Sequence, residues 1–230
     1  MQGPDIYRVL QSIGATHLHH ANSVMTSCTF LEQGGLLSRG FVEDHHLQQT
    51  AQYTDQDDRK YAIWHLVFVD HVDIHERGGR SRGPNKYGPV LFVLDLDILL
   101  HLPAGTDIAI TKKNPSNWRD NEANGERWFE NLDELAKNIH FGDFDKMLMI
   151  HIPSNRLNFP NHQANMILDN PQRKLSSGED AYAHAAHRLM TAAAHGNIQA
   201  SIEQRQCKAG CICIPTYSRY TNQKFDLYFS

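Results

Sequence analysis

Hydrophobic residues recur along the chain with two different spacings. In the first, apolar side chains follow the three-to-four-residue period of a helix face, as they do from Ile6 to Ile13. In the second, β-branched and aromatic residues run continuously or alternate, as in Val90–Leu94, which is typical of strands. The first spacing predicts helices over residues 5–13, 127–138 and 177–198. It predicts a further helix that begins after a cap at Asn22 or Ser23 and ends at Gly34. The second predicts strands over residues 15–20, 61–69, 89–96, 107–111, 146–152, 164–168, 211–215 and 225–229.

Polar stretches separate these elements, and they predict long connecting loops at residues 48–60, 75–88 and 112–125. No internal repeat occurs, and no linker is long enough to divide the chain. We therefore expect residues 1–230 to form a single α+β domain with a split, largely antiparallel sheet core and flanking helices.

Composition narrows the class of protein. Hydrophobic residues make up 40% of the chain and charged residues 21%, a balance that excludes wholesale disorder. The longest apolar runs fall far short of the roughly 20 residues that cross a bilayer. The first residues lack the basic and apolar regions of a secretory signal. These features predict a soluble cytoplasmic protein without a membrane partner.

The charge balance constrains nucleic-acid binding. The 22 basic and 26 acidic residues give a formal net charge of −4, whereas phosphate backbones attract basic surfaces. Binding to nucleic acid would therefore require a local basic patch. The loop from Arg77 to Lys86 carries such a patch, with Arg82 near its centre.

The most informative segment is THLHHANSVMTSCTFLEQGGLLSRG, residues 16–40. It predicts a strand that ends in closely spaced histidines, then a capped helix, then the motif GGLLS. This arrangement resembles the ADP-ribosyltransferase superfamily, and within it the DarT-type and mRNA-modifying bacterial toxins. The resemblance implies that His17, His19 and Asn22 contact the ribose and amide parts of NAD.

A second segment, NKYGPVLFVLDLD at residues 85–97, resembles the central strand of the same family. The resemblance implies an aromatic ring that stacks on the nicotinamide. Tyr87 is the first candidate and Phe92 the alternative, because a flat aromatic face suits an electron-poor ring. Arg82 in the preceding basic loop is a candidate contact to the NAD pyrophosphate, since guanidinium groups pair with such oxygens.

The third expected element is a catalytic glutamate, which relatives present as Gln-Ala-Glu before a hydrophobic residue. Here the sequence is Gln163-Ala164-Asn165-Met166, so Asn165 occupies the catalytic position without a carboxylate. A carboxylate would stabilise the cationic state formed as the nicotinamide bond breaks. Three interpretations follow: an inactivating glutamate-to-asparagine change at this position, a substitute carboxylate at Asp169 or Glu179, or a degenerate relative that binds NAD.

Aromatic and basic residues alternate near Trp118 and Arg119, with Lys113 upstream. Such a stretch is suited to stacking an unpaired base and binding its backbone. We predict that Lys113, Trp118 and Arg119 contact the nucleic-acid substrate.

Cys207, Cys211 and Cys213 form an unusual C-x3-C-x-C pattern. Together with a histidine such as His195 they could bind zinc. Because the alternation from Cys211 to Ile214 equally fits a half-buried strand, the sequence favours reduced structural thiols and no metal.

These observations predict a bacterial toxin-type mono-ADP-ribosyltransferase that moves ADP-ribose from NAD to a nucleobase, with RNA preferred over single-stranded DNA. The resemblance also implies an antitoxin partner, and in some systems a chaperone. Two alternatives remain open. One is a non-catalytic NAD- or RNA-binding module, with or without structural zinc. The other is a protein-modifying ADP-ribosyltransferase.

Overall fold

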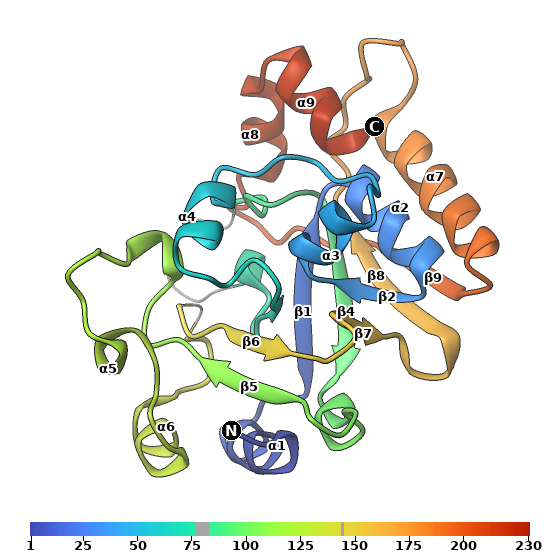
Figure 1. Ribbon diagram of the computed structural model, residues 1–230. Coiled ribbons are helices and arrows are strands. Elements are labelled where there is room, and N and C mark those ends of the chain that lie inside the picture. Colours follow the sequence, from blue (N-terminus) through green and yellow to red (C-terminus); the bar gives the residue numbers. More distant parts are fainter. Residues whose placement is uncertain (77–82, 144) are drawn as a thin grey trace.

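The computed structural model describes residues 1–76, 83–143 and 145–230. They form a mixed α+β fold in which helices surround two β-sheets and a short strand pair (Figure 1). The α+β class predicted from the sequence is confirmed. Arg77, Arg80 and Arg82 of the predicted basic loop lie outside the described residues.

The larger sheet has the strand order β1-β4-β8-β9. Its strands are β1 (His17–Asn22), β4 (Val90–Asp95), β8 (Gln163–Leu168) and β9 (Gln199–Gln204). β4 lies antiparallel to both β1 and β8, whereas β8 and β9 are parallel. Figure 1 shows β1 and β4 running side by side through the middle of the molecule.

The smaller sheet is antiparallel, in the order β3-β6-β5. It consists of β3 (Val67–Val69), β6 (Leu148–His151) and β5 (Asp107–Ile110). β2 (Gly35–Leu37) and β7 (Arg156–Asn158) form a separate antiparallel pair. A backbone bridge between His19 and Asp70 joins β1 of the larger sheet to the end of β3.

The helices cover the outside of these sheets. Their bounds are α1 (Gly3–Ser12), α2 (Val24–Gln33), α3 (Arg39–Asp44), α4 (Asp55–Lys60), α5 (Asn124–Arg127), α6 (Leu132–Asn138), α7 (Ala181–His195), α8 (Cys213–Arg219) and α9 (Asn222–Phe229). Helices α2 and α7 pack against each other (Figure 1). Gly196, just after α7, permits this close approach, because a Cβ there would lie 2.0 Å from the Leu31 carbonyl oxygen. Among the described residues, no helix combines the length and apolarity needed to cross a membrane.

Local capping explains why α2 begins and ends where it does. The Ser23 hydroxyl accepts a hydrogen bond from the Thr26 amide, and Gly34 ends the helix in the left-handed conformation with φ of 74°. The predicted cap at Ser23 and stop at Gly34 are both confirmed. Asn22 lies one residue earlier, at the end of β1.

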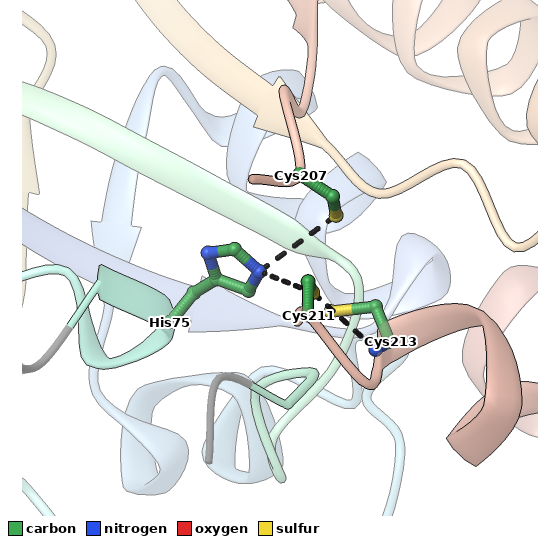
Figure 2. Close-up of side chains that lie close together, drawn as sticks. All are labelled: His75, Cys207, Cys211 and Cys213. Atoms are coloured by element: carbon green, nitrogen blue, oxygen red, sulfur yellow. Dashed lines mark hydrogen bonds between the residues drawn. The ribbon is translucent and has the colours of Figure 1, made fainter. Parts of the chain in front are cut away.

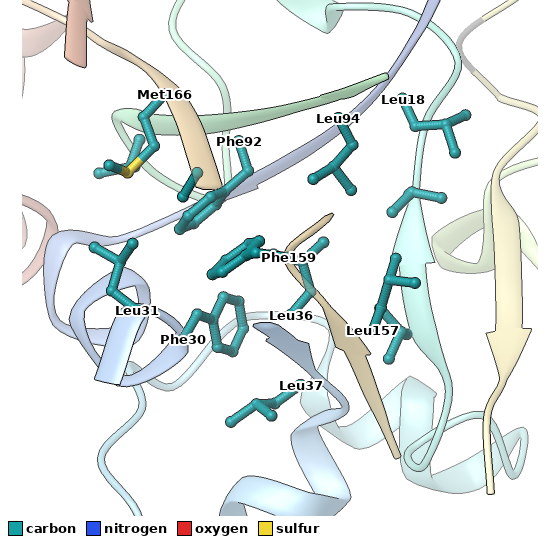
Figure 3. Packing of buried hydrophobic residues seen from close by; sticks show 14 of the residues in the cluster. Leu18, Phe30, Leu31, Leu36, Leu37, Phe92, Leu94, Leu157, Phe159 and Met166 are labelled. Carbon is teal, nitrogen blue, oxygen red and sulfur yellow. The ribbon is translucent and has the colours of Figure 1, made fainter. Parts of the chain in front are cut away.

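The hydrophobic core lies between the larger sheet, α2 and the β2–β7 pair. Phe92 on β4 is fully buried, and its ring lies 6.1 Å from that of Phe30 and 5.4 Å from that of Phe159 (Figure 3). Leu94 and Met166 extend the same buried face, whereas Val93 and Asn165 lie on the opposite face. The alternation of β4 and β8 therefore separates the core face from a second face, on which Leu91 is also buried and Asn165 is exposed.

The C-terminal strand predictions are wrong. Residues 211–215 and 225–229 belong largely to α8 and α9, because Cys213 and Tyr217, and then Phe225 and Phe229, are buried pairs spaced four residues apart. Aromatic contacts stabilise the helix further, because the Phe225 and Phe229 rings stack with their centroids 4.8 Å apart.

Three other boundaries also differ. The predicted loop at 48–60 contains α4, and the strand predicted at 61–69 is restricted to β3. The helix predicted at 127–138 begins instead at Leu132, because the Asn131 side chain accepts a hydrogen bond from the Glu134 amide and caps it there. The polar edge strand β9 was not predicted.

Replacing Phe92 tests this account of the core. Phe92→Ala removes a ring packed between two others and should lower the free energy of unfolding by about 3–5 kcal/mol. Phe141→Ala is the matched control, because that ring is 67% exposed and its loss should change stability little. Urea unfolding measures both variants. Equal stability of the two would contradict the assignment of Phe92 to the core.

Candidate active site

A narrow cavity of about 60 Å³ lies where the two sheets meet. We call it the inner cavity; the polar residues that line it include His20, Asn22, Arg39, Asp58, Asp70 and Tyr87. It adjoins a wider outer cleft of about 560 Å³, whose lining includes Tyr53, Ile74, Ile212 and Tyr228. Asn85, Tyr87, Asn114 and Ser116 line both spaces. The outer cleft is of the size that binds small molecules, and the inner cavity extends it inwards.

His20 on β1 is held in one tautomer. Its Nδ1 lies 2.6 Å from the Phe68 carbonyl oxygen, which can only accept, so Nδ1 carries the proton. Burial lowers the His20 pKa to about 4, which keeps the ring neutral at physiological pH. Nε2 is therefore a hydrogen-bond acceptor, and it faces the Asn22 side-chain nitrogen at 3.4 Å.

Asn22 is oriented by its neighbours as well. Its side-chain oxygen accepts hydrogen bonds from the Ser23 amide at 3.0 Å and from the Gln52 side chain at 3.1 Å. Its NH₂ group therefore points towards His20. The Nε2 acceptor of His20 is thereby occupied by Asn22, and the strand end presents the second Asn22 N–H as a fixed donor at the inner cavity, which is the preorganisation that polar ligand recognition requires.

Arg39 supplies positive charge to the inner cavity. It begins α3, directly after Ser38, whose hydroxyl accepts a hydrogen bond from the Phe41 amide and caps that helix. Its Nη2 donates to the Thr50 carbonyl at 3.1 Å and to Asp55 at 2.8 Å. Its Nε and Nη1 are buried and have no partner within the described part of the chain. Buried guanidinium donors of this kind are suited to a phosphate or carboxylate ligand.

Two buried carboxyl groups face the same space. Burial, reinforced by nearby Asp55, raises the pKa of Asp58 to about 7, although Arg39 opposes this. Burial raises the pKa of Asp70 to about 8. The Asp70 Oδ1 atom is buried without a hydrogen-bond partner among the described residues. Strongly shifted carboxyl groups in a cavity are characteristic of functional sites, because a stable core would avoid them.

Tyr87 stands at the boundary of the inner cavity and the outer cleft. Its ring stacks against Tyr53, with centroids 5.8 Å apart. The neighbouring Gly88 has φ of 150°, and a Cβ there would lie 2.2 Å from the Asn22 carbonyl. Glycine therefore permits the loop to approach the end of β1 and places Tyr87 beside Asn22. Burial raises the Tyr87 pKa well above its usual value, so the hydroxyl stays protonated.

The structure separates the predicted NAD residues into two groups. Asn22 and Tyr87 line the inner cavity, whereas His17 and His19 do not. His19 and Asn165 lie on the second face of the larger sheet, in one row with Val93 between them. His17 is half-exposed, with Nε2 3.5 Å from Asp95. Phe92, the alternative stacking residue, is enclosed in the core.

Asn165 and its two substitutes also lie away from the cavity. The Asn165 side chain accepts a hydrogen bond from Ser201 on β9 at 2.8 Å. Asp169 is buried between Arg205 and Tyr217, which donate to its two oxygens at 2.5 Å each. Glu179 is exposed and accepts a hydrogen bond from the Ser177 hydroxyl. The carboxyl groups that line the inner cavity are Asp58 and Asp70.

The predicted nucleic-acid residues do not form an open stacking surface. Trp118 is only 6% exposed and packs edge-on against Trp128 and Tyr61. Lys113 is paired with Glu122 at 2.5 Å. Arg119 is exposed. Burial removes the Trp118 faces on which a base would stack.

His195, the histidine that the sequence offered as a possible zinc ligand beside the cysteines, lies elsewhere. His195 is exposed at the end of α7. The group of side chains that brings Cys207, Cys211 and Cys213 together with a histidine contains His75 instead.

Sequence reasoning missed His20, Arg39, Asp58 and Asp70. Two of them carried a signal: His20 is the last histidine of HLHH and has the same alternation as Asn22, and Arg39 directly follows GGLLS. Asp58 and Asp70 become visible as functional candidates only through their burial.

No protein-family model matches the chain, and no curated protein matches it significantly.

The neutral histidines make a prediction about acid stability. His19 and His20 both have pKa values lowered by burial to about 4, against 6.5 in the unfolded chain. Their contribution to stability is therefore complete above pH 6.5 and is lost as the pH falls towards 4, because only the unfolded state takes up the protons. His20→Asn should reduce the slope of unfolding free energy against pH by up to about 1.4 kcal/mol per pH unit.

Urea unfolding between pH 4 and pH 7 measures this slope. His101→Asn, at an exposed position, is the control and should keep the slope of the unmodified protein. An unchanged slope in His20→Asn would contradict a buried neutral ring.

Proposed function

We propose that the protein is a mono-ADP-ribosyltransferase that binds NAD in the inner cavity and outer cleft and transfers ADP-ribose to a nucleobase of RNA. The observation that carries the proposal is the meeting of two distant segments. Asn22, in the segment that ends in GGLLS, and Tyr87, in NKYGPVLFV, line one cavity. These are the two segments on which the family resemblance depends. The resemblance implies that both residues contact NAD, and their presence in one cavity supports that expectation.

The chemistry of the cavity fits the charged parts of NAD. The buried Arg39 Nε and Nη1 atoms lack partners among the described residues, and a pyrophosphate oxygen would satisfy them. Tyr87 offers an aromatic ring at the junction of cavity and cleft, where a nicotinamide ring could stack. Asn22, with one N–H donating to His20, offers its second N–H to an oxygen of the amide or ribose groups. NAD supplies the ADP-ribosyl group, with nicotinamide as the leaving group.

Asp70 is the best candidate for the carboxylate that stabilises the developing positive charge. Of Asp58 and Asp70, it is the one whose backbone pairs with β1, through His19. In its ionised form it places a negative charge in a desolvated site, where such charges act most strongly on a cationic transition state. The Asp70 pKa of about 8 means that much of the free enzyme carries the protonated form at neutral pH.

The RNA acceptor rests on the family resemblance. The outer cleft supports it only in size, since it is wide enough to admit an acceptor beside the inner cavity. An acceptor base would have to be unpaired or flipped to reach this depth. An antitoxin that covers the outer cleft would fit the same proposal.

NAD titration tests the binding step. We expect saturable thermal stabilisation of the unmodified protein by NAD, because the ligand binds only the folded state. Tyr87→Ala should weaken NAD binding about tenfold or more, a loss of at least about 1.4 kcal/mol of binding free energy. Tyr182→Ala, on α7 and outside both spaces, is the matched control and should bind normally. Absence of stabilisation at millimolar NAD would refute the proposal.

The pH dependence of transfer tests the role of Asp70. With labelled NAD and RNA, kcat/KM should rise with pH through about 8, since this parameter reports the ionisation of the free enzyme. Asp70→Asn should abolish transfer, whereas Asp97→Asn, at an exposed position, should retain the rise.

Asn165→Glu separates this account from the inactivated-enzyme interpretation. If Asp70 is the functional carboxylate, the change should leave transfer unaltered. A large gain of activity in Asn165→Glu, with activity retained in Asp70→Asn, would contradict the assignment. Label that survives nuclease digestion would identify a protein acceptor instead of RNA.

A further inference from the structure

Four potential metal ligands converge away from the inner cavity. Figure 2 shows the side chains of His75, Cys207, Cys211 and Cys213 pointing towards one another. The His75 Nε2 atom lies 3.2 Å from the Cys211 sulfur and 3.8 Å from the Cys207 sulfur. All four ligand atoms lie within 4.8 Å of one another. We call this group the Cys₃His cluster.

We propose that the Cys₃His cluster binds a structural zinc ion. Zinc–sulfur bonds of about 2.3 Å and zinc–nitrogen bonds of about 2.0 Å in a tetrahedron place the ligand atoms roughly 3.5–3.8 Å apart. The observed separations need only small side-chain movements to reach those values. The cluster also has the ligand types, three sulfurs and one imidazole nitrogen, that zinc prefers over magnesium or calcium.

The cluster is better suited to a structural ion than to a catalytic one. Four protein ligands fill a tetrahedral zinc shell, so no position remains for water or substrate. Zinc binding would displace the three thiol protons to solvent and leave the imidazole Nε2 as the neutral ligand. A disulfide would use only two of the three sulfurs, and all three are free thiols.

Surrounding contacts hold the ligands in place. The Cys213 amide donates to the Cys211 sulfur at 3.4 Å, an interaction that also suits a metal-bound thiolate. Asp73 accepts a hydrogen bond from the His75 amide at 3.0 Å. Arg205 then joins Asp73 to the buried Asp169, at 2.6 Å and 2.5 Å respectively. These ion pairs connect the segment that carries Asp73 and His75 to the segment that carries Arg205 and Cys207.

The position of the cluster suggests what the ion stabilises. His75 and Cys207 are 132 residues apart in the sequence, so one ion would close a very long loop. Ile74 and Ile212 adjoin the ligands and line the outer cleft. Zinc at this position would hold two walls of the outer cleft together, whatever ligand the cleft binds.

Metal analysis of the full chain tests the proposal. The protein should be purified under reducing conditions without chelators or a metal-affinity step, and its metals measured by inductively coupled plasma mass spectrometry. We expect one zinc ion per chain. Cys207→Ser and His75→Gln should lose most of it. Cys28→Ala and His195→Gln, which alter a thiol and an imidazole outside the cluster, should retain it.

Cobalt substitution keeps the test decisive if a variant fails to fold. The unmodified protein, stripped of metal and titrated with Co²⁺, should show the visible bands of tetrahedral thiolate coordination, and zinc should abolish them. A purified protein that lacks zinc and gives no such bands would overturn the proposal. Retention of zinc by both Cys207→Ser and His75→Gln, or a different metal in its place, would also overturn it.

Discussion

The backbone pairing of His19 with Asp70 is the interaction on which the candidate site depends. Each residue donates its amide to the carbonyl of the other, at 2.7 and 2.8 Å. This bridge joins the larger sheet to the smaller one, because His19 lies in β1 and Asp70 directly follows β3. With β1 fixed between β4 and Asp70, its end presents His20 and Asn22 at the junction of the two sheets. The inner cavity lies at this junction because the backbone pair holds the two sheets together there.

The polar groups around this cavity are poorly placed for stability. Burial lowers the pKa of His20 and raises those of Asp58 and Asp70, so the neutral form of each group is favoured over the charged form. Arg39 leaves buried donors without partners among the described residues. A fold retains such costs where a ligand relieves them, and departures from good packing therefore cluster at functional sites. These departures favour the inner cavity over the second face of the larger sheet as the ligand site.

Local signals in the sequence predicted part of this structure. The cap at Ser23, the stop at Gly34 and the apolar run of β4 depend on neighbours in the chain, and all three can be read from it. At the C-terminus, the alternation from Cys211 to Ile214 predicted a strand, but burial at four-residue spacing favours α8. The resemblance also predicted Asn22 and Tyr87 as contacts to NAD, and the structure places both at the inner cavity, but their role stays a prediction.

The remaining features depend on contacts between distant residues. The burial of Asp70 and the contact of His75 with Cys207, 132 positions later, follow from the tertiary fold and from no local pattern. A crystal structure of the protein with NAD tests the central claim most directly. We predict NAD in the inner cavity and outer cleft, with its pyrophosphate on Arg39 and its nicotinamide beside Tyr87. NAD on the second face of the larger sheet, against His19 and Asn165, would contradict the account.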